Sequence, residues 1–185
     1  MQKISLSGAW EMRAAQGTAW LPAVVPGTVY QTLMASGQMD DPFYRDNELQ
    51  AFELMNGDYI YRRHFHLSEE DLQGDALLLE FEGLDTLGTI ALNEEFVGSC
   101  DNMHRTWTFD VKGMVVEGLN VLEVRLDSPL QFIRAAYQQV KADGSSDATV
   151  GFPHRRKAHC MFGWVWGLRL PDAGLFRDVY LYKVD

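Results

Sequence analysis

Short stretches in which apolar and polar residues alternate are the feature of this 185-residue sequence that most restricts its fold. Successive side chains of a strand point to opposite faces of a sheet, so alternation with a period of two predicts strands with one buried face. The clearest stretches are Asp58–Leu67, Asp75–Leu84 and Gly118–Leu126. Glycine and proline turns separate many such stretches. The pattern therefore predicts an all-β sandwich rather than a parallel α/β sheet.

Other segments extend the pattern in both directions. A first strand is expected at Leu6–Met12 and an extended piece at Leu21–Thr28, which ends in a Pro-Gly turn. The region from Leu84 to Asp110 is typical of a strand, a tight turn, a second strand, a loop and a third strand. A last strand is expected within Leu175–Val184.

One or two short helices interrupt the strands. Thr28 is placed as an N-cap, the apolar residues that follow it share a helical face, and Gly37 is placed to end the helix. A second short helix is expected over Ile133–Val140, and an exposed loop over Lys141–Asp147.

Length and charge limit the class of protein. A chain of 185 residues with 46% hydrophobic residues is long enough for one domain, 1–185, with a substantial core. Its formal net charge of -10 argues against nucleic acid and anionic membranes as partners, because no excess of Lys and Arg replaces counterions. A neutral ligand fits better. No signal peptide or membrane span is evident, so a cytoplasmic location is expected.

Several residue pairs invite a metal or catalytic interpretation that the sequence does not favour. Cys100 and Cys160 lack CxxC spacing, so free buried thiols are expected, with a chance disulfide left open. His64 and His66 share one strand face without a local acidic partner, and solvent-facing histidines are the better interpretation. Two carboxylates on one strand face, Glu80 and Glu82, are expected to be solvated. We expect no metal and no cofactor.

The segment Phe162–Leu170 is the strongest candidate for a functional site. It holds two of the five tryptophans, Trp164 and Trp166, with glycines on both sides. If the segment is extended, both indoles lie on the same face. Such an apolar surface either packs on a sugar ring or fills a core, and composition does not decide between the two.

The surroundings of these tryptophans resemble a signature of the β-mannosidases of glycoside hydrolase family 2. That signature reads Arg-Lys-Ala, then Phe-Gly-Trp-Asp-Trp-Gly-Pro, then Ala-Gly-Ile-Trp-Arg. Here Arg156-Lys157-Ala158 precedes Phe162-Gly163-Trp164-Val165-Trp166-Gly167, and Ala173-Gly174-Leu175-Phe176-Arg177 follows. The chain departs from the signature at Val165, Leu168 and Phe176. A valine cannot accept the sugar hydrogen bonds that an aspartate accepts.

Three further stretches are similar to the same family: Val25–Thr28 with Gly37, Asp41–Glu48, and Gly83–Arg105. The resemblance covers nearly the whole chain. It implies a jelly-roll sandwich of the galactose-binding-domain type, found at the front of these enzymes. Family 2 enzymes also carry a catalytic Asn-Glu pair, but in a later barrel domain. Asn47 and Glu48 are therefore interpreted as a capping or turn element.

The resemblance implies that this chain belongs to a larger retaining hydrolase of a terminal β-mannoside or related β-glycoside. The catalytic glutamates would lie in following domains of the same polypeptide, so this chain alone would supply no catalytic residue. Trp164, Val165 and Trp166 would form one wall of the glycon pocket. Two alternatives stay open: a free-standing, non-catalytic carbohydrate-binding module, and a structural domain whose tryptophans are core.

Overall fold

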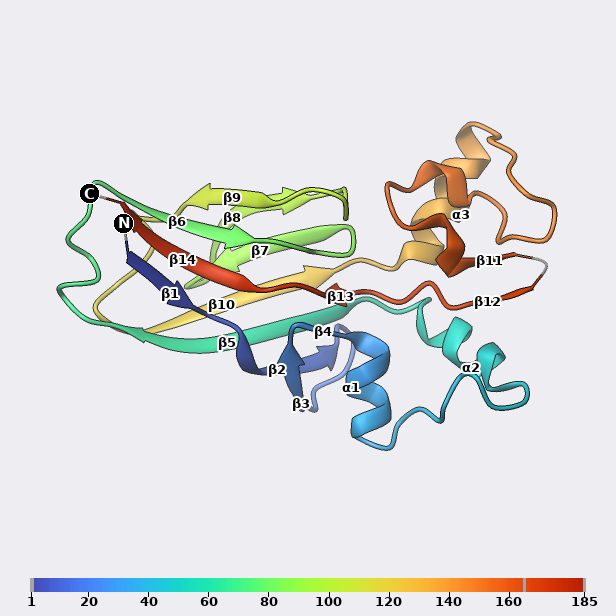
Figure 1. Ribbon diagram of the computed structural model, residues 1–185, viewed down its shortest axis with the longest axis horizontal. Helices are drawn as coiled ribbons and strands as arrows, with labels where there is room; N and C mark the ends of the chain where they lie inside the picture. The colour runs from blue at the N-terminus through green and yellow to red at the C-terminus, as the bar shows by residue number, and fades with distance from the viewer. Residues whose placement is uncertain (1, 165, 185) are drawn as a thin grey trace.

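Two antiparallel β-sheets form the body of the protein, as the computed structural model shows for residues 2–164 and 166–184 (Figure 1). The six-stranded sheet has the order β3-β2-β5-β10-β7-β8, and the four-stranded sheet has the order β1-β14-β6-β9. Their buried side chains join in one hydrophobic cluster. The expected all-β sandwich is therefore confirmed.

The strands and helices have the following bounds. The strands are β1 Gln2–Ser5, β2 Gly8–Ala14, β3 Leu21–Val25, β4 Gly27–Thr28, β5 Tyr59–Leu67, β6 Ala76–Phe81, β7 Gly88–Leu92, β8 Glu95–Cys100, β9 Trp107–Asp110, β10 Gly118–Leu126, β11 Phe162–Trp164, β12 Gly167–Arg169, β13 Gly174–Leu175 and β14 Val179–Val184. The helices are α1 Val29–Ala35, α2 Asn47–Leu54 and α3 Pro129–Gln139, with two 3₁₀ turns, η1 Phe152–His154 and η2 His159–Met161.

The predicted alternation matches the observed burial. In β6, Leu77, Leu79 and Phe81 are buried, as are Leu122 and Val124 in β10. The two strands lie in different sheets, so these side chains meet in the core between them. Burial of large apolar side chains at about 25 cal/mol per Å² is the main term that holds such a sandwich together.

Helix α1 begins where the sequence predicts. The Thr28 side chain accepts a hydrogen bond from the Gln31 backbone N–H at 3.3 Å, and the Gln31 side chain accepts one from the Thr28 N–H at 3.1 Å. This reciprocal capping box satisfies two backbone donors that the first turn of a helix leaves unpaired.

Three elements differ from the expectations. Strand β1 was not predicted, and it pairs with β14 at the opposite end of the chain. Helix α2 was also not predicted; its N-cap, Asp46, makes no side-chain capping bond. Helix α3 begins at Pro129 rather than Ile133, since Ser128 accepts a hydrogen bond from Gln131 and proline is favourable in the first helical turn.

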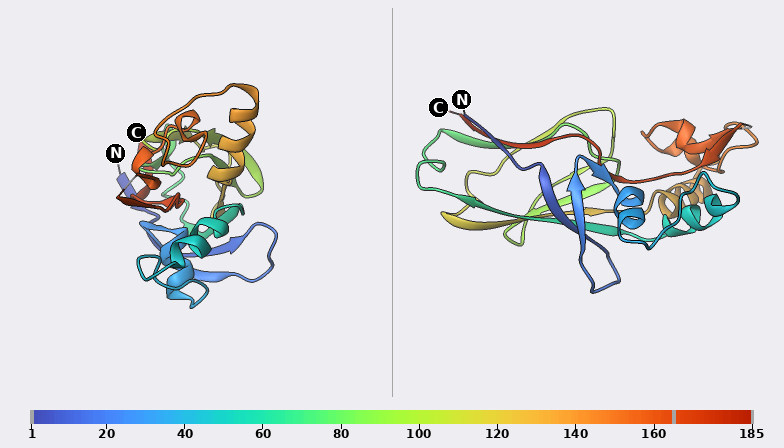
Figure 2. Two further views of the ribbon diagram at one scale, coloured as in Figure 1. Left: turned by 90° about the vertical axis from the view of Figure 1, so that its right-hand side faces the viewer. Right: turned by 60° about the horizontal axis from the view of Figure 1, so that its bottom comes forward.

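Most of the elements outside the sandwich are gathered at one end of the molecule. Helices α2 and α3, the two 3₁₀ turns and the β11–β12 hairpin lie beyond the ends of the sandwich strands, while the two chain termini lie at the other end (Figures 1 and 2). We call this group of elements the end cap. It carries both candidate tryptophans.

Candidate functional site

The tryptophan segment is a β-hairpin rather than one extended strand. β11 and β12 pair antiparallel, with Trp164 opposite Gly167 and Phe162 opposite Arg169. Gly163 has a positive φ of 96°, a conformation that a residue with a side chain adopts only with strain. The antiparallel pairing shows that the chain turns back within this segment, so the condition of one extended strand is not met.

The two indoles nevertheless lie together. Their ring centroids are 5.4 Å apart with an interplanar angle of 30°, the stacked arrangement that aromatic rings favour. Trp164 is 46% exposed and Trp166 is 79% exposed. The alternative that both tryptophans belong to the core is therefore wrong. Val165, the third predicted site residue, lies outside the described residues.

Residues distant in the sequence hold the base of this hairpin. The backbone N–H of Arg169 donates to Oε1 of Glu48 in α2 at 2.7 Å. On the other strand, the backbone N–H and the hydroxyl of Thr149 both donate to the carbonyl oxygen of Phe162, at 2.9 and 3.0 Å. Both strands of the hairpin are thus fixed, which orients the exposed indoles.

Aromatic packing beneath the hairpin continues this support. Phe162 is fully buried, and its ring centroid lies 6.1 Å from that of Phe152. His159 meets Phe152 edge to face, with centroids 4.9 Å apart. Gly144 packs so closely on the Phe152 ring that an added Cβ would overlap it. The hairpin therefore rests on a packed aromatic base.

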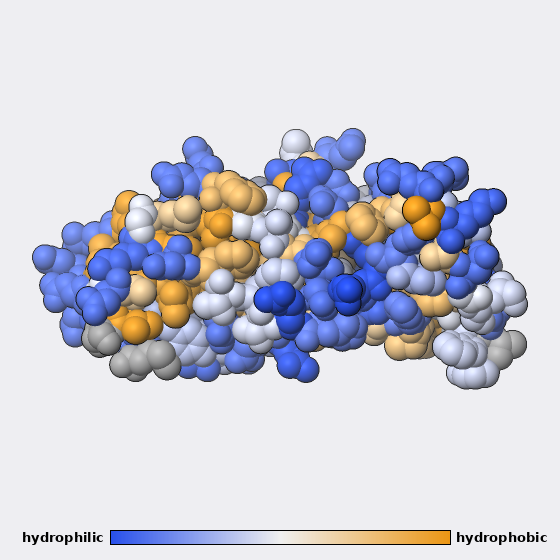
Figure 3. Space-filling model, turned by 90° about the horizontal axis from the view of Figure 1, so that it is seen from above, coloured by the Kyte–Doolittle hydropathy of each residue, from blue (hydrophilic) through white to orange (hydrophobic). Residues whose placement is uncertain are grey.

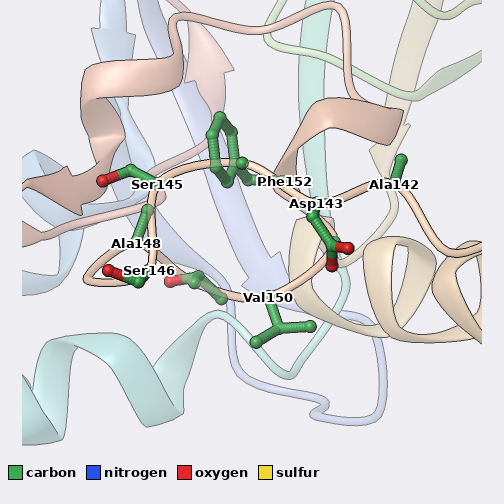
Figure 4. Close-up of a pocket in the computed structure, with 10 residues that line it drawn as sticks. Ala142, Asp143, Ser145, Ser146, Ala148, Val150 and Phe152 are labelled. Atoms are coloured by element: carbon green, nitrogen blue, oxygen red, sulfur yellow. The ribbon is translucent and has the colours of Figure 1, made fainter.

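The loop that supplies Phe152 also forms a small cavity next to the hairpin. Its volume is about 220 Å³, and residues 142–146 and 148–152 line it. Figure 4 shows the Phe152 ring between the side chains of Ser145 and Asp143 in that view. Arg169 of β12 donates to the carbonyl oxygen of Asp147 at 3.1 Å, which joins this loop to the hairpin.

Below the end cap, a buried ion pair joins four segments of the chain. Lys157 is 2% exposed, and its Nζ bonds the Asp85 carboxylate and, at 2.5 Å, the carbonyl oxygen of Asp172. The Asp172 carboxylate accepts hydrogen bonds from the backbone N–H groups of Tyr30 and Ala173. Burial lowers the pKa of Lys157 and raises that of Asp172 to about 6. This network fixes the segment that leads into the hairpin.

The other predicted pairs lie away from the tryptophans, with one exception. Asn47 and Glu48 were expected to cap a helix or form a turn, but they are the first two residues of α2, whose N-cap is Asp46. Asn47 donates to the carbonyl oxygen of Asp41 at 2.9 Å, whereas Glu48 supports the hairpin. His64 and His66 are exposed on β5. His64 Nδ1 lies 3.7 Å from the Glu11 carboxylate, on a neighbouring strand.

The cysteines and the remaining carboxylates are also placed by the structure. Both thiols are free, which excludes the disulfide, but only Cys100 is buried and the expected burial of Cys160 is wrong. Cys160 lies in η2, a turn on the surface of the end cap. Glu80 and Glu82 are half-buried. Among the described residues, no helix combines the length and apolar character needed to cross a bilayer.

Sequence reasoning missed the residues that hold the hairpin, above all Glu48, Thr149 and Arg169. Glu48 is 121 positions from Arg169 and has no local pattern that marks its role. Only the fold brings α2 against β12.

Comparison with known proteins identifies the relatives of this chain. A sequence model described as "Glycosyl hydrolase 2 galactose-binding domain-like" matches residues 10–177. A β-mannosidase of Capra hircus is 33% identical over an alignment of 184 residues that covers 95% of this chain and 21% of the relative. Beta-mannosidase B of Neosartorya fischeri is 34% identical over 98% of this chain and 22% of its own length. The chain thus spans about a fifth of the length of these curated relatives.

A solved structure agrees with these relatives. The β-D-mannosidase of Dictyoglomus thermophilum superposes with a TM-score of 0.90 at 38% identity, over 99% of this chain and 23% of its own. An exo-chitosanase of Amycolatopsis orientalis shares the fold, with a TM-score of 0.72 at 16% identity.

Proposed function

The chain belongs to the galactose-binding-like domain family of glycosyl hydrolase family 2, and from this premise we propose that it forms one wall of the glycon pocket of a β-mannosidase-like enzyme. In this proposal, residues 1–185 are a single domain of a longer polypeptide. The substrate is a terminal β-mannoside or a related β-glycoside.

The observation that carries the proposal is the stacked, exposed pair Trp164 and Trp166 at the end of a firmly held hairpin. Binding pockets are lined mainly by apolar and aromatic side chains, with a few polar groups that fix orientation. Large exposed indoles held in one place supply the aromatic part of such a lining. The hydrogen bonds from Thr149 and to Glu48 keep that surface in one position.

The chemistry itself would fall to other parts of the polypeptide. Retaining glycosidases use one carboxylate as nucleophile and a second as general acid and base, about 5–5.5 Å apart. We assign neither role to a carboxylate of this chain. The role proposed for this chain is to bind and orient the glycon and to exclude water from one side.

The test is kinetic and uses the longer polypeptide that contains this chain. Replacing Trp166 by alanine is expected to lower kcat/KM for an aryl β-mannoside by tenfold or more, because the aromatic surface contacts the glycon. The matched control is Phe96→Ala, which removes an aromatic residue that is 64% exposed on β8 in the sandwich. Equal kcat/KM for the Trp166 variant and the wild type would refute the proposal.

The alternative, a free-standing carbohydrate-binding module, makes a different prediction for the 185-residue chain. A single wall lacks converging polar groups, so the proposed role predicts weak or undetectable binding of mannose and β-linked oligosaccharides in calorimetry. Sub-micromolar binding by this chain alone would support the module instead.

The residue between the tryptophans sets the expected preference for the sugar. A hydrogen bond to a charged group contributes about 1.5–3 kcal/mol, and Val165 cannot accept one. Val165→Asp in the longer polypeptide is therefore expected to raise kcat/KM for a β-mannoside by roughly tenfold. A lower melting temperature without a kinetic gain would remove Val165 from the proposed pocket.

A further inference from the structure

A second cavity lies between the β8–β9 loop and residues 153–159, the segment that leads into the tryptophan hairpin. Its volume is about 780 Å³, several times that of the cavity beside the hairpin. We call it the basic pocket, and its lining residues are Asn102, His104, Pro153, His154, Arg155, Arg156, Lys157, Ala158 and His159.

The composition of the basic pocket is unusual for this protein. The chain carries 26 acidic and 16 basic residues, yet none of the nine lining residues is acidic, and six are Arg, Lys or His. Figure 3 shows that hydrophilic residues, interspersed with hydrophobic patches, cover the face seen from above, so the signs of the charges come from the lining residues themselves. A local excess of positive charge in an acidic protein favours an anionic ligand.

Arg155 is the residue that most needs explanation. It is 3% exposed, and none of its three guanidinium nitrogens has a hydrogen-bond partner among the described residues. Its guanidinium carbon lies 4.4 Å from the centroid of the Phe132 ring, a cation–π contact that satisfies no N–H group. Buried charges in proteins are normally paired and hydrogen-bonded.

The neighbouring carboxylates are already engaged. Asp85 and Asp127 attract the charge of Arg155 but make no hydrogen bond with it. Asp85 pairs with Lys157 instead, and Asp127 pairs with Arg125 at 3.2 Å. Asp101 also acts at longer range and is exposed. Lys157 is paired with Asp85 within its own network, so that carboxylate does not compensate the buried positive charge of Arg155.

We propose that the basic pocket binds a small oxyanion, with Arg155 as its anchoring cation. A planar guanidinium bonds a carboxylate or phosphate through two parallel N–H groups, which would satisfy the donors that the protein leaves unpaired. The guanidinium nitrogens are covered, so the proposal requires the Arg155 side chain to rotate away from Phe132 toward the pocket that Arg155 lines. Arg156 and His104 would complete the positive rim. This inference does not depend on the proposed role of the tryptophans.

The cavity has room for more than an isolated ion. The anion could be inorganic phosphate or the carboxylate of a sugar acid, and both present the same chemistry to Arg155. Glucuronate and phosphate are therefore the two probes, with mannose as the uncharged probe.

The experiment measures the melting temperature of the 185-residue chain at constant ionic strength, with chloride as the reference. A bound ligand at ten times its Kd is expected to raise the melting temperature by about 3–5 °C. Phosphate or glucuronate should produce this rise and mannose should not. The anion that gives the larger rise shows whether the pocket prefers inorganic phosphate or the carboxylate of a sugar acid. No rise with either anion, or an equal rise with mannose, would overturn the proposal.

Two variants locate the effect. Arg155→Met is expected to abolish the rise and also to increase the melting temperature without anion, because it removes a buried unpaired charge. Lys141→Gln, which removes one charge from an exposed residue in the loop after α3, should keep the full rise. An anion effect that is the same in Arg155→Met and the wild type would refute Arg155 as the anchor.

A third variant keeps the test decisive if Arg155→Met does not fold. Arg156→Gln changes an exposed rim residue, and calorimetry should show a three- to tenfold higher Kd for the stronger anion. An unchanged Kd would exclude the basic pocket as the binding site.

Discussion

Replacing Asp172 by asparagine tests whether the buried charge below the end cap opposes folding at neutral pH. Asp172 is 8% exposed, and its Oδ1 accepts backbone hydrogen bonds from Tyr30 at 3.1 Å and Ala173 at 2.8 Å. Asparagine keeps an acceptor oxygen at this position and removes the charge. The substitution therefore separates the cost of the charge from the value of the hydrogen bonds.

The magnitude follows from the pKa. Burial is the largest cause that raises the pKa of Asp172, from 3.8 to about 6, although hydrogen bonds and Lys157 act in the opposite direction. A rise of that size corresponds to ~3 kcal/mol of difference between the protonated and ionised forms in the folded state. Ionised Asp172 should thus lower the free energy of unfolding by a few kcal/mol.

Proton linkage determines how the contribution of Asp172 to the free energy of unfolding changes with pH. Because the folded-state pKa lies above the unfolded value, the favourable contribution of Asp172 is complete below about pH 3.8. It is lost as the pH rises through about 6. The free energy of unfolding of the Asp172→Asn variant, minus that of the wild type, should therefore increase between pH 4 and pH 6 and be constant above pH 7.

The assay is urea unfolding of both proteins at half-unit intervals from pH 4 to pH 8. Asp71→Asn is the matched control, because hydrogen bonds from Ser68 lower the pKa of Asp71 and its contribution is lost as the pH falls. Because the pKa of Asp71 is lowered from 3.8, Asp71 is ionised in both states over nearly all of this range, so its difference from the wild type should stay nearly constant from pH 5 to pH 8. Parallel profiles for Asp172→Asn and the wild type would refute the reasoning.

Three further substitutions test the support of the hairpin and the buried ion pair. Gly163→Ala places a Cβ at a φ of 96° and 2.5 Å from Cγ of Arg169, so a loss of ~1 kcal/mol or more is expected in urea unfolding. Glu48→Ala removes the acceptor of the Arg169 N–H; hydrogen exchange of that amide should accelerate, while the melting temperature falls by only a few degrees. Lys157→Met leaves Asp85 buried without its partner, so a loss of ~3–5 kcal/mol is expected, and a variant as stable as the wild type would contradict the pairing.

Much of the fold could be predicted from local sequence, because its determinants are local. Alternation in β5, β6 and β10 places their apolar side chains in the core whatever the partner strand is. Thr28 and Gln31 are three residues apart and cap α1 within a single turn. The family motifs around Lys157 and the tryptophans were equally visible in the sequence.

Tertiary structure alone decided how the candidate site is built. Strand β1 has little pattern of its own and exists because β14, from the far end of the chain, supplies its hydrogen bonds. Glu48 reaches Arg169 across 121 positions, and nothing in the local sequence marks Arg155 as buried although it is 3% exposed. Side-chain periodicity reports which face of an element is buried, whereas the partner of a polar group depends on which distant segments the packed core brings together.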